Sequence, residues 1–324
     1  MEVAIKVHDL TKRYPNILAV DQIHFEVYRG EIFGFLGPNG AGKTTTINML
    51  TGVTKPTSGT AFISGFDIMR EPTKAKNEVG VVPSASCLYD EMTAWDNVNF
   101  SAKLHGVPRD KRVGRAKELL ELFGLYERRN DRVDTFSTGL KRRLMIATAL
   151  IHEPKILFLD EPTTGLDVQS QRQIRDLIKE LMEKDTTIFL TTHYIEEADQ
   201  LCQRIAIIDK GKIITLDTPE KLKTMAQVEH VIKISFDHAK KITDKLKRLS
   251  HVMNLVEAGD KFRLYVEDPS ETLPLIFDFA KENHLRVVSV NTLKPTLEDA
   301  FVKLTGLRPE VMTIEKEHVK PIRG

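Results

Sequence analysis

A glycine-rich segment of nine residues constrains the fold of this chain more than any other stretch. It consists of Gly37, Pro38, Asn39, Gly40, Ala41, Gly42, Lys43, Thr44 and Thr45. Glycines let successive backbone N–H groups curl around a phosphate without a Cβ in the way, and Lys43 adds a positive charge. The hydroxyl of Thr44 suits Mg²⁺. The spacing predicts a phosphate-binding loop, and a chance match in a glycine-rich turn is the alternative.

The residues on either side of this loop favour phosphate binding. Residues 31–36 are an apolar run typical of a buried strand, and residues 44–50 have a helical pattern. A helix that begins here directs the positive end of its dipole at a bound anion. The order of strand, loop and helix therefore predicts an α/β fold organised around a phosphate.

Two carboxylates follow a second apolar strand. Residues 156–159 lead directly into Asp160 and Glu161. At the carboxyl end of a buried parallel strand, Asp160 can hold Mg²⁺ through water, and Glu161 can orient or deprotonate a water that attacks a γ-phosphate. A structural Asp-Glu-Pro turn is the alternative. The apolar strand 187–192 ends at His193, which we expect at the same sheet edge, with a purely structural histidine as the alternative.

The charge balance provides no strong field around the molecule. Lys and Arg total 47 against 46 for Asp and Glu in 324 residues, a net charge of +1, so we expect no nucleic-acid partner. The N-terminus lacks a signal-peptide pattern, and no stretch approaches about 18 uninterrupted apolar residues. We therefore expect a cytoplasmic chain. Cys87 and Cys202 stand alone and are expected to be buried rather than to form a disulfide or zinc site.

Periodicity predicts the other elements of the first domain. Residues 3–7 and 23–28 alternate like antiparallel strands around a turn at 12–16, where Tyr14 offers a face to an adenine ring. Further strands are expected at 60–63, 79–83 and 205–209, the last closing the sheet, and helices at 93–105, 110–123 and 169–184. Ser137 is the expected N-cap of an apolar helix through residue 151, on which Lys141, Arg142 and Arg143 form a solvated face.

This ordered set resembles the ATP-binding cassette (ABC) ATPases over about residues 3–220. The resemblance implies a P-loop NTPase cassette with an antiparallel β layer and a helical subdomain, and it implies ATP and Mg²⁺ as cofactors. In that family, the residues at six positions contact adenine, the phosphates, Mg²⁺ and the attacking water. In this chain these positions are Tyr14, Lys43, Thr44, Asp160, Glu161 and His193.

Two more segments carry the resemblance. Ser137, Thr138, Gly139 and Leu140 occupy the place of the family's signature motif, which binds the γ-phosphate held by the opposite subunit. Asp167 fits the dimer-contact loop. The resemblance implies that two cassettes close head to tail on two ATP molecules and that hydrolysis separates them.

Two residues depart from the family pattern. Ser84 stands where a Gln normally reaches Mg²⁺ and senses the membrane partner, so Ser84 is a candidate metal contact on a shorter side chain. Thr138 replaces the first glycine of the signature and adds a Cβ where a phosphate approaches the backbone. We therefore predict a slower basal ATPase than in a cassette with the usual residues.

The pattern changes after residue 220. We assign residues 1–220 to the ATP-binding domain, with its helical subdomain at about 90–152, residues 221–306 to an α+β accessory domain, and residues 307–324 to a charged tail. The order βαββαβ between residues 228 and 291 suggests a small ferredoxin-like domain, followed by a helix at 296–305. Residues 294–301 resemble the end of a C-terminal extension of exporter-type ABC systems with separate permease chains.

The resulting functional prediction is an ATP-hydrolysing subunit that drives a separate integral membrane permease, in an exporter. We expect a second cassette as partner, most simply another copy of the chain, and attachment to the inner face of the cell membrane through the permease. The alternatives are a soluble ABC ATPase without a transport role and an ATP-binding subunit of weak catalysis paired with a second cassette. Glu161 and His193 argue against the last.

Overall fold

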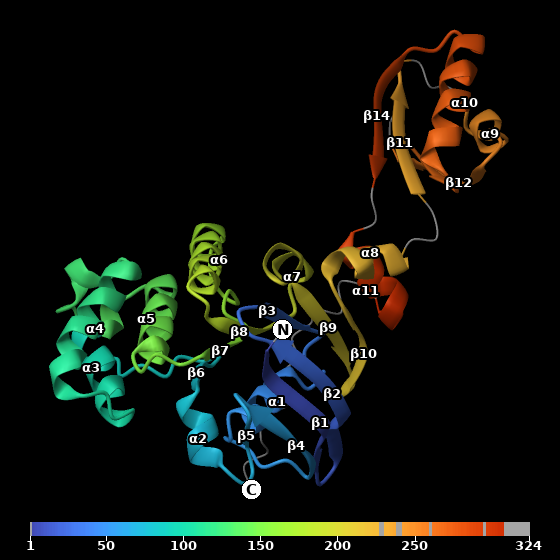
Figure 1. Ribbon diagram of the computed structural model, residues 1–324. Coiled ribbons are helices and arrows are strands. Elements are labelled where there is room, and N and C mark those ends of the chain that lie inside the picture. Colours follow the sequence, from blue (N-terminus) through green and yellow to red (C-terminus); the bar gives the residue numbers. More distant parts are fainter. Residues whose placement is uncertain (1, 227–229, 238–241, 259–260, 294–295, 308–324) are drawn as a thin grey trace, which may run out of the picture. The chain divides into compact units, whose positions relative to one another are not determined.

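The computed structural model describes residues 2–226, 230–237, 242–258, 261–293 and 296–307. All of the expected tail beyond Leu307 lies outside these residues. The chain divides into two units, one that runs to Pro219 and one from Glu220 to Gly306, and each is described by itself (Figure 1).

The first unit is built on a six-stranded sheet in the order β10-β9-β3-β8-β7-β6. Strands β9 to β6 in this order pair in parallel, and β10 pairs antiparallel with β9. The strands are β3 (Ile32–Leu36), β6 (Val79–Val82), β7 (Ile156–Asp160), β8 (Thr187–Thr192), β9 (Arg204–Asp209) and β10 (Lys212–Asp217). The prediction that residues 205–209 close the sheet is wrong, because a turn at Lys210 and Gly211, both with positive φ, returns the chain as β10.

A four-stranded antiparallel sheet in the order β2-β1-β4-β5 forms the second layer. Its strands are β1 (Val3–Tyr14), β2 (Ile17–Tyr28), β4 (Ser58–Ile63) and β5 (Phe66–Asp67). The first two are longer than predicted, because register shifts between Val7 and Lys12 interrupt the alternation without ending the ladder. Tyr14 pairs with Ile17, so the turn is shorter than the predicted 12–16.

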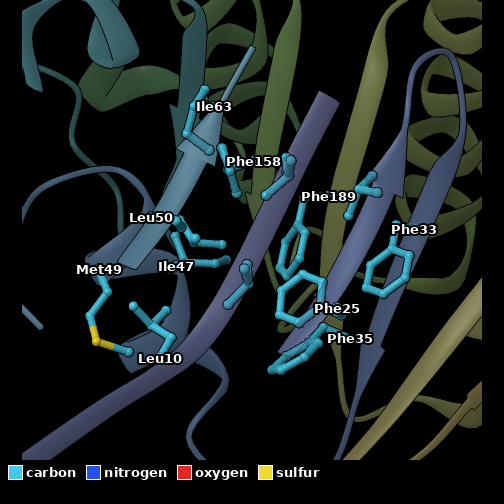
Figure 2. Close-up of a cluster of buried hydrophobic side chains, with 14 of the residues drawn as sticks. Leu10, Phe25, Phe33, Phe35, Ile47, Met49, Leu50, Ile63, Phe158 and Phe189 are labelled. Atoms are coloured by element: carbon cyan, nitrogen blue, oxygen red, sulfur yellow. The ribbon is translucent and has the colours of Figure 1, made fainter. Parts of the chain in front are cut away.

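Aromatic side chains fill the space between the two sheets. Phe33 and Phe35 are two residues apart on β3 and so face the same way, toward Phe25 of β2. The rings of Phe25 and Phe33 stack with centroids 5.4 Å apart. Figure 2 shows this cluster, which also contains Phe158, Phe189, Ile47, Met49 and Leu50. The last three belong to α1 (Lys43–Leu50), so the core anchors the helix that follows the glycine-rich loop.

Helices α6 (Val168–Glu183) and α7 (Ile195–Leu201) lie on the other side of the parallel sheet (Figure 1). A Cβ at Gly34 of β3 would come within 2.6 Å of Cys202 Sγ, just after α7, so this close packing requires glycine. Cys202 is buried as expected, whereas the expectation is wrong for Cys87, which is exposed. Helices α7 and α2 (Pro72–Asn77) were not predicted from the sequence, because both are too short for a clear helical period.

Three helices form a separate group at the left of Figure 1. They are α3 (Ala94–Leu104), α4 (Arg109–Leu122) and α5 (Thr138–Leu150), and they pack against one another. Thr93 caps α3 and Ser137 caps α5, as predicted for Ser137, each with a side-chain oxygen that accepts a backbone N–H. Two 3₁₀ turns, Tyr126–Arg128 and Val133–Thr135, connect α4 to α5.

The second unit contains an antiparallel sheet in the order β12-β13-β11-β14, with α9 and α10 on one face (Figure 1). Its elements are α8 (Pro219–Ala226), β11 (His230–Phe236), α9 (Thr243–Lys247), β12 (Val252–Ala258), β13 (Lys261–Val266), α10 (Pro269–Glu282), β14 (Val287–Leu293) and α11 (Leu297–Thr305). This is the predicted ferredoxin-like order. Residues 228–229 of the expected first strand and 238–241 of the expected first helix lie outside the described ranges. Among the helices of these ranges, none combines the length and apolar character that a bilayer span requires.

Candidate functional site: a nucleotide loop and its carboxylates

The glycine-rich loop leaves β3 at Leu36 and enters α1 at Lys43. A Cβ at Gly37 would lie 2.3 Å from the carbonyl oxygen of Ile208. At Gly42, φ is 109° and a Cβ would lie 2.5 Å from the carbonyl oxygen of Ala19, so both positions require glycine. Gly42 is the N-cap of α1 and has no side chain to cap it, which leaves the first N–H groups of the helix available to an anion.

Lys43 lies across this loop and is only 4% exposed. Its Nζ donates to the carbonyl oxygens of Gly37 at 2.7 Å and Pro38 at 3.2 Å, and lies 3.2 Å from Glu161 Oε1. Burial lowers the pKa of Lys43, and the carboxylates of Glu161 and Asp160 oppose that shift. A positive charge is therefore already held at the loop, paired with a carboxylate that a phosphate can replace.

Glu161 directly follows β7 but leaves the strand geometry, with φ of 50°. Consecutive residues of a regular strand point to opposite faces, yet here Asp160 and Glu161 contact the neighbouring residues Thr44 and Lys43. Glu161 Oε2 also lies 3.2 Å from His193 Nδ1. Burial raises the pKa of Glu161, but His193 and Lys43 together outweigh burial and lower it to about 2. Glu161 is therefore ionised at neutral pH.

Thr44 and Asp160 form a pair of oxygen donors beside the loop. Thr44 Oγ1 donates to Asp160 Oδ2 at 3.0 Å, and Thr191 Oγ1 donates to Asp160 Oδ1 at 2.5 Å. A hydroxyl with one oriented carboxylate suits Mg²⁺, which prefers oxygen ligands and keeps several waters. Sequence reasoning missed Thr191, although its place near the carboxyl end of β8, two residues before His193, was the available signal.

A pocket of about 360 Å³ opens over the loop. Ile17, Leu18 and Ala19 of β2 line it together with Lys210, Glu161 and the loop. Only Tyr14 was predicted to contact adenine. These three residues were not, although they form an apolar run just after the hairpin turn. Tyr14 pairs with Ile17 in the ladder and is 41% exposed, with Lys12 Nζ 5.0 Å from its ring centroid.

The two segments expected at a dimer contact are joined to each other. A Cβ at Gly139, in the first turn of α5, would lie 2.7 Å from Ser170 Oγ of α6. Asp167 caps α6 by accepting from the N–H of Ser170 at 2.9 Å and from its hydroxyl at 2.7 Å. Ser137 and Thr138 are exposed at the start of α5. None of these residues lines the described pocket over the loop.

Ser84 is exposed on the loop after β6, and its carbonyl oxygen accepts a hydrogen bond from Arg142 at 2.9 Å. Within the described residues, no hydrogen bond joins the Ser84 side chain to Thr44 or Asp160. The expectation that Lys141, Arg142 and Arg143 form a solvated face is wrong for Arg142, which is 6% exposed. The helical period places Arg142 on the buried face of α5 with Gly139, Met145, Ile146 and Ala149.

Comparison with known proteins supports these observations. The ABC transporter family pattern matches residues 20–164, and the pattern for the C-terminal domain of DrrA1-3-like ATP-binding proteins matches residues 218–305. The linearmycin resistance ATP-binding protein LnrL of Bacillus subtilis (strain 168) is 36% identical over 305 residues, 93% of this chain and 98% of LnrL. The daunorubicin/doxorubicin resistance ATP-binding protein DrrA of Streptomyces peucetius is 34% identical over 94% of this chain and 92% of DrrA.

Solved structures show the same fold. The chain matches cbiO1 from Clostridium perfringens, part of the ABC transporter complex cbiONQ, with a TM-score of 0.64 and 27% identity over 77% of this chain and 96% of that one. It also matches a dimeric post-hydrolysis structure of an ATP-binding cassette bound to ADP and Pi, with a TM-score of 0.61 and 28% identity over 66% of this chain and 98% of that one.

These features define a P-loop nucleotide hydrolase: a glycine loop with its paired lysine, carboxylates at the neighbouring strand end, and a histidine against the second carboxylate. The predicted cassette fold is confirmed. The chain belongs to the ATP-binding proteins of ABC transporters. It is the nucleotide-binding subunit of a transporter, and it binds and hydrolyses ATP. Subunits of this class dimerise and work with membrane permeases.

Proposed function

We propose that two copies of this subunit close on two ATP molecules, and that Lys43, Glu161 and His193 carry binding and hydrolysis at each. The observation behind this proposal is the position of Glu161, 3.2 Å from both Lys43 Nζ and His193 Nδ1. Phosphates that reach the loop compete with Glu161 for Lys43. Glu161 then loses a charge that lowers its pKa, and it becomes a better base for the attacking water.

Each residue of the loop and its surroundings has a separate task. The backbone N–H groups of residues 39, 40 and 42–45, together with Lys43 Nζ, bind phosphate oxygens. Glu161 orients the attacking water and accepts its proton, and His193 Nδ1 holds Glu161 Oε2 in place. Thr44 and Asp160 would hold Mg²⁺, which supplies positive charge to the phosphates when bound. Tyr14, Ile17 and Leu18 flank the adenine.

The second copy completes each site in this proposal. The exposed start of α5 presents Ser137 and the backbone at Gly139 to the γ-phosphate held by the other copy, and Asp167 lines the contact. The approach of Gly139 to Ser170, which donates to Asp167, supports the assignment, because it places the two segments side by side.

We further propose a separate permease that exports its cargo. Support comes from the relatives, whose names refer to linearmycin resistance, daunorubicin/doxorubicin resistance and, at 35% identity in Cupriavidus metallidurans, Nod factor export. A groove of about 380 Å³ is lined by Tyr89, Phe100 and Leu104 and lies between the loop after β6 and the helical group. Leu104 is 70% exposed, which suits the apolar contact of a permease loop. Through this contact the chain would lie at the inner face of the membrane.

Size-exclusion chromatography of Glu161→Gln with and without ATP tests the dimer. The substitution removes the base but keeps the loop, so ATP is expected to bind, turnover to fall by at least about 100-fold, and the protein to shift to a dimer. Glu183→Gln, an exposed carboxylate at the end of α6, is the matched control and should keep its turnover.

A Glu161→Gln protein that binds ATP and stays monomeric would contradict closure by two copies, and would point to a different cassette as the second partner. Wild-type protein that binds ATP without turnover, alone or with the permease, would instead favour a binding subunit of weak catalysis. Ser84 and Thr138, where the family has Gln and Gly, are the observation behind that second candidate.

A further inference from the structure

Arg142 is a buried cation that the catalytic scheme does not use. It lies one turn into α5 and is 6% exposed, between the partly exposed Lys141 and Arg143. Within the described residues, no carboxylate lies within 4.0 Å of its guanidinium. A buried charge is costly unless its donors are satisfied, so its contacts must compensate for lost hydration.

Those contacts are two backbone carbonyls on a different element. One terminal nitrogen of Arg142 donates to the carbonyl oxygen of Pro83 at 2.8 Å and the other to that of Ser84 at 2.9 Å. The planar guanidinium presents these donors as a rigid fork, which a lysine cannot reproduce. The fork ties the first turns of α5 to the carboxyl end of β6.

The end of β6 adjoins the nucleotide site. Val82 pairs in parallel with Leu159, so Pro83 and Ser84 follow β6 just where Asp160 and Glu161 follow on β7. The negative charges of Asp160 and Glu161 act on Arg142 at longer range and partly offset its burial. Arg142 thus connects the carboxyl end of β6, which lies beside the proposed ATP site of the same chain, with the start of α5.

The start of α5 is the segment assigned above to the ATP of the second copy. Ser137 and Gly139 precede Arg142 by five and three residues on the same helix. A change at the end of β6 would therefore pass through Arg142 to the helix end that meets the other copy's nucleotide. The ion pair of Lys141 with Asp90 also joins α5 to this loop, but it is partly exposed and weaker for that reason.

We propose that Arg142 is a positioning residue that couples the ATP site of its own chain to the signature end of α5, so that ATP bound in one copy places the helix that closes on the ATP of the other. The proposal rests on the proposed function, since closure on two ATP molecules is the step that Arg142 positions.

The test compares Arg142→Met, Arg142→Lys and Arg143→Met. Arg143→Met is the matched control, because Arg143 neighbours Arg142 on α5 but bonds Gln173 of α6. Three quantities are measured: the ATP affinity of each variant in the Glu161→Gln background, kcat and KM with Glu161 present, and the ATP-dependent change in hydrogen exchange of the amides at 138–142.

Arg142→Met is expected to keep its ATP affinity within about twofold and to lose about tenfold or more in kcat, as for lost hydrogen bonds from a charged group. Its amides at 138–142 should no longer respond to ATP. Arg142→Lys should lie between Arg142→Met and wild type, because its ammonium keeps the charge but does not present two parallel donors in one rigid plane. Arg143→Met should resemble wild type. A role confined to stability would leave the exchange response intact in the folded variant.

Equal kcat and exchange in Arg142→Met and Arg143→Met would overturn the proposal, as would a loss of ATP affinity as large as the loss in kcat. If Arg142→Met does not fold, Arg142→Lys decides, and wild-type kcat and exchange in that variant would overturn the proposal. If the Glu161→Gln protein stays monomeric with ATP, that result contradicts the two-copy dimer but does not bear on the role of Arg142. The ATP-dependent change in hydrogen exchange, compared with and without Arg142, still tests the coupling. If the Glu161→Gln protein with Arg142 intact shows no such change, the coupling is overturned.

Discussion

Lys43 and Glu161 form an ion pair at the glycine loop, with Nζ 3.2 Å from Oε1 and both side chains largely withdrawn from solvent. The carboxylate of Glu161 pairs with the buried ammonium of Lys43 and so stabilises the protein in the absence of ATP. Under the proposed function, the same contact also restrains the base. Its energetic consequences can be measured separately from catalysis.

The stability of the nucleotide-free protein should depend on the ionisation of Glu161. Its pKa is about 2 in the fold against an ordinary 4.5, so its stabilising contribution is present above about pH 4.5 and is lost as the pH falls toward 2. The shift corresponds to about 3 kcal/mol. Glu161→Gln should lower the free energy of unfolding at pH 7 by up to about that amount and weaken its dependence on acid. Urea unfolding at pH 7 and pH 3.5 checks this, and equal acid dependence in wild type and variant would contradict it.

Thr191→Val should weaken the use of Mg²⁺ while it preserves the shape of the side chain. It removes the hydroxyl that donates to Asp160 Oδ1 and accepts from the N–H of Glu161 at 3.1 Å. Loss of a group that orients a metal ligand costs about 10- to 100-fold in metal affinity. ATPase rates across a Mg²⁺ titration measure this. Thr187→Val, which loses a bond to Gly30 at the other end of β8, is the control and should change stability without moving the Mg²⁺ midpoint.

Replacing Ser84 with Gln and Thr138 with Gly, the residues usual in the family, should raise the basal rate of ATP hydrolysis. Both Ser84 and Thr138 are exposed, so Ser84→Gln and Thr138→Gly leave the core unchanged. One added hydrogen bond at the transition state is worth about two- to tenfold in rate. Steady-state ATPase assays of the double variant check this rise, with Ser86→Gln on the same loop as control. Turnover that stays at the wild-type value would sink the prediction.

Gly139→Ala should separate α5 from α6. Its Cβ would lie 2.7 Å from Ser170 Oγ and 3.1 Å from Ser170 Cβ, so the helices must shift at a cost of about 1–3 kcal/mol. Adding Ser170→Gly removes both atoms and should restore part of the stability and of ATP-dependent dimerisation. Thermal unfolding and chromatography of the single and double variants test this. If the loss of stability in the double variant equals the sum of the losses in the two single variants, the result argues against the contact between Gly139 and Ser170.

Local spacing in the sequence is enough to name the residues that the structure brings together at the glycine loop, and their roles toward ATP stay a prediction. The glycines, Lys43 and Thr44 are contiguous, and Asp160, Glu161 and His193 stand at the ends of apolar strands that can only be buried. The pairing of Glu161 with both Lys43 and His193 could not be predicted, because it depends on which strands are neighbours and on a left-handed backbone at one residue.

Other failures arose where short segments carry too little pattern. The elements β10, α2 and α7 have six or seven residues each, and β10 is an edge strand of mixed exposure. Arg142 was missed for another reason, since three consecutive cations resemble a solvated surface. The position of Arg142 three residues after Gly139 and three before Met145 was a usable signal for the buried face of the helix.

The positive φ of Glu161 has a consequence for anyone who transplants this site into another scaffold. An Asp-Glu pair grafted onto the end of an ordinary strand would send its two carboxylates to opposite sides of the sheet. The recipient must also supply the bend at Glu161 and the turn in which the N–H of Thr164 donates to the carbonyl oxygen of Glu161. The feature that must be transferred is therefore the main-chain conformation at Glu161, together with the two acidic side chains that it orients.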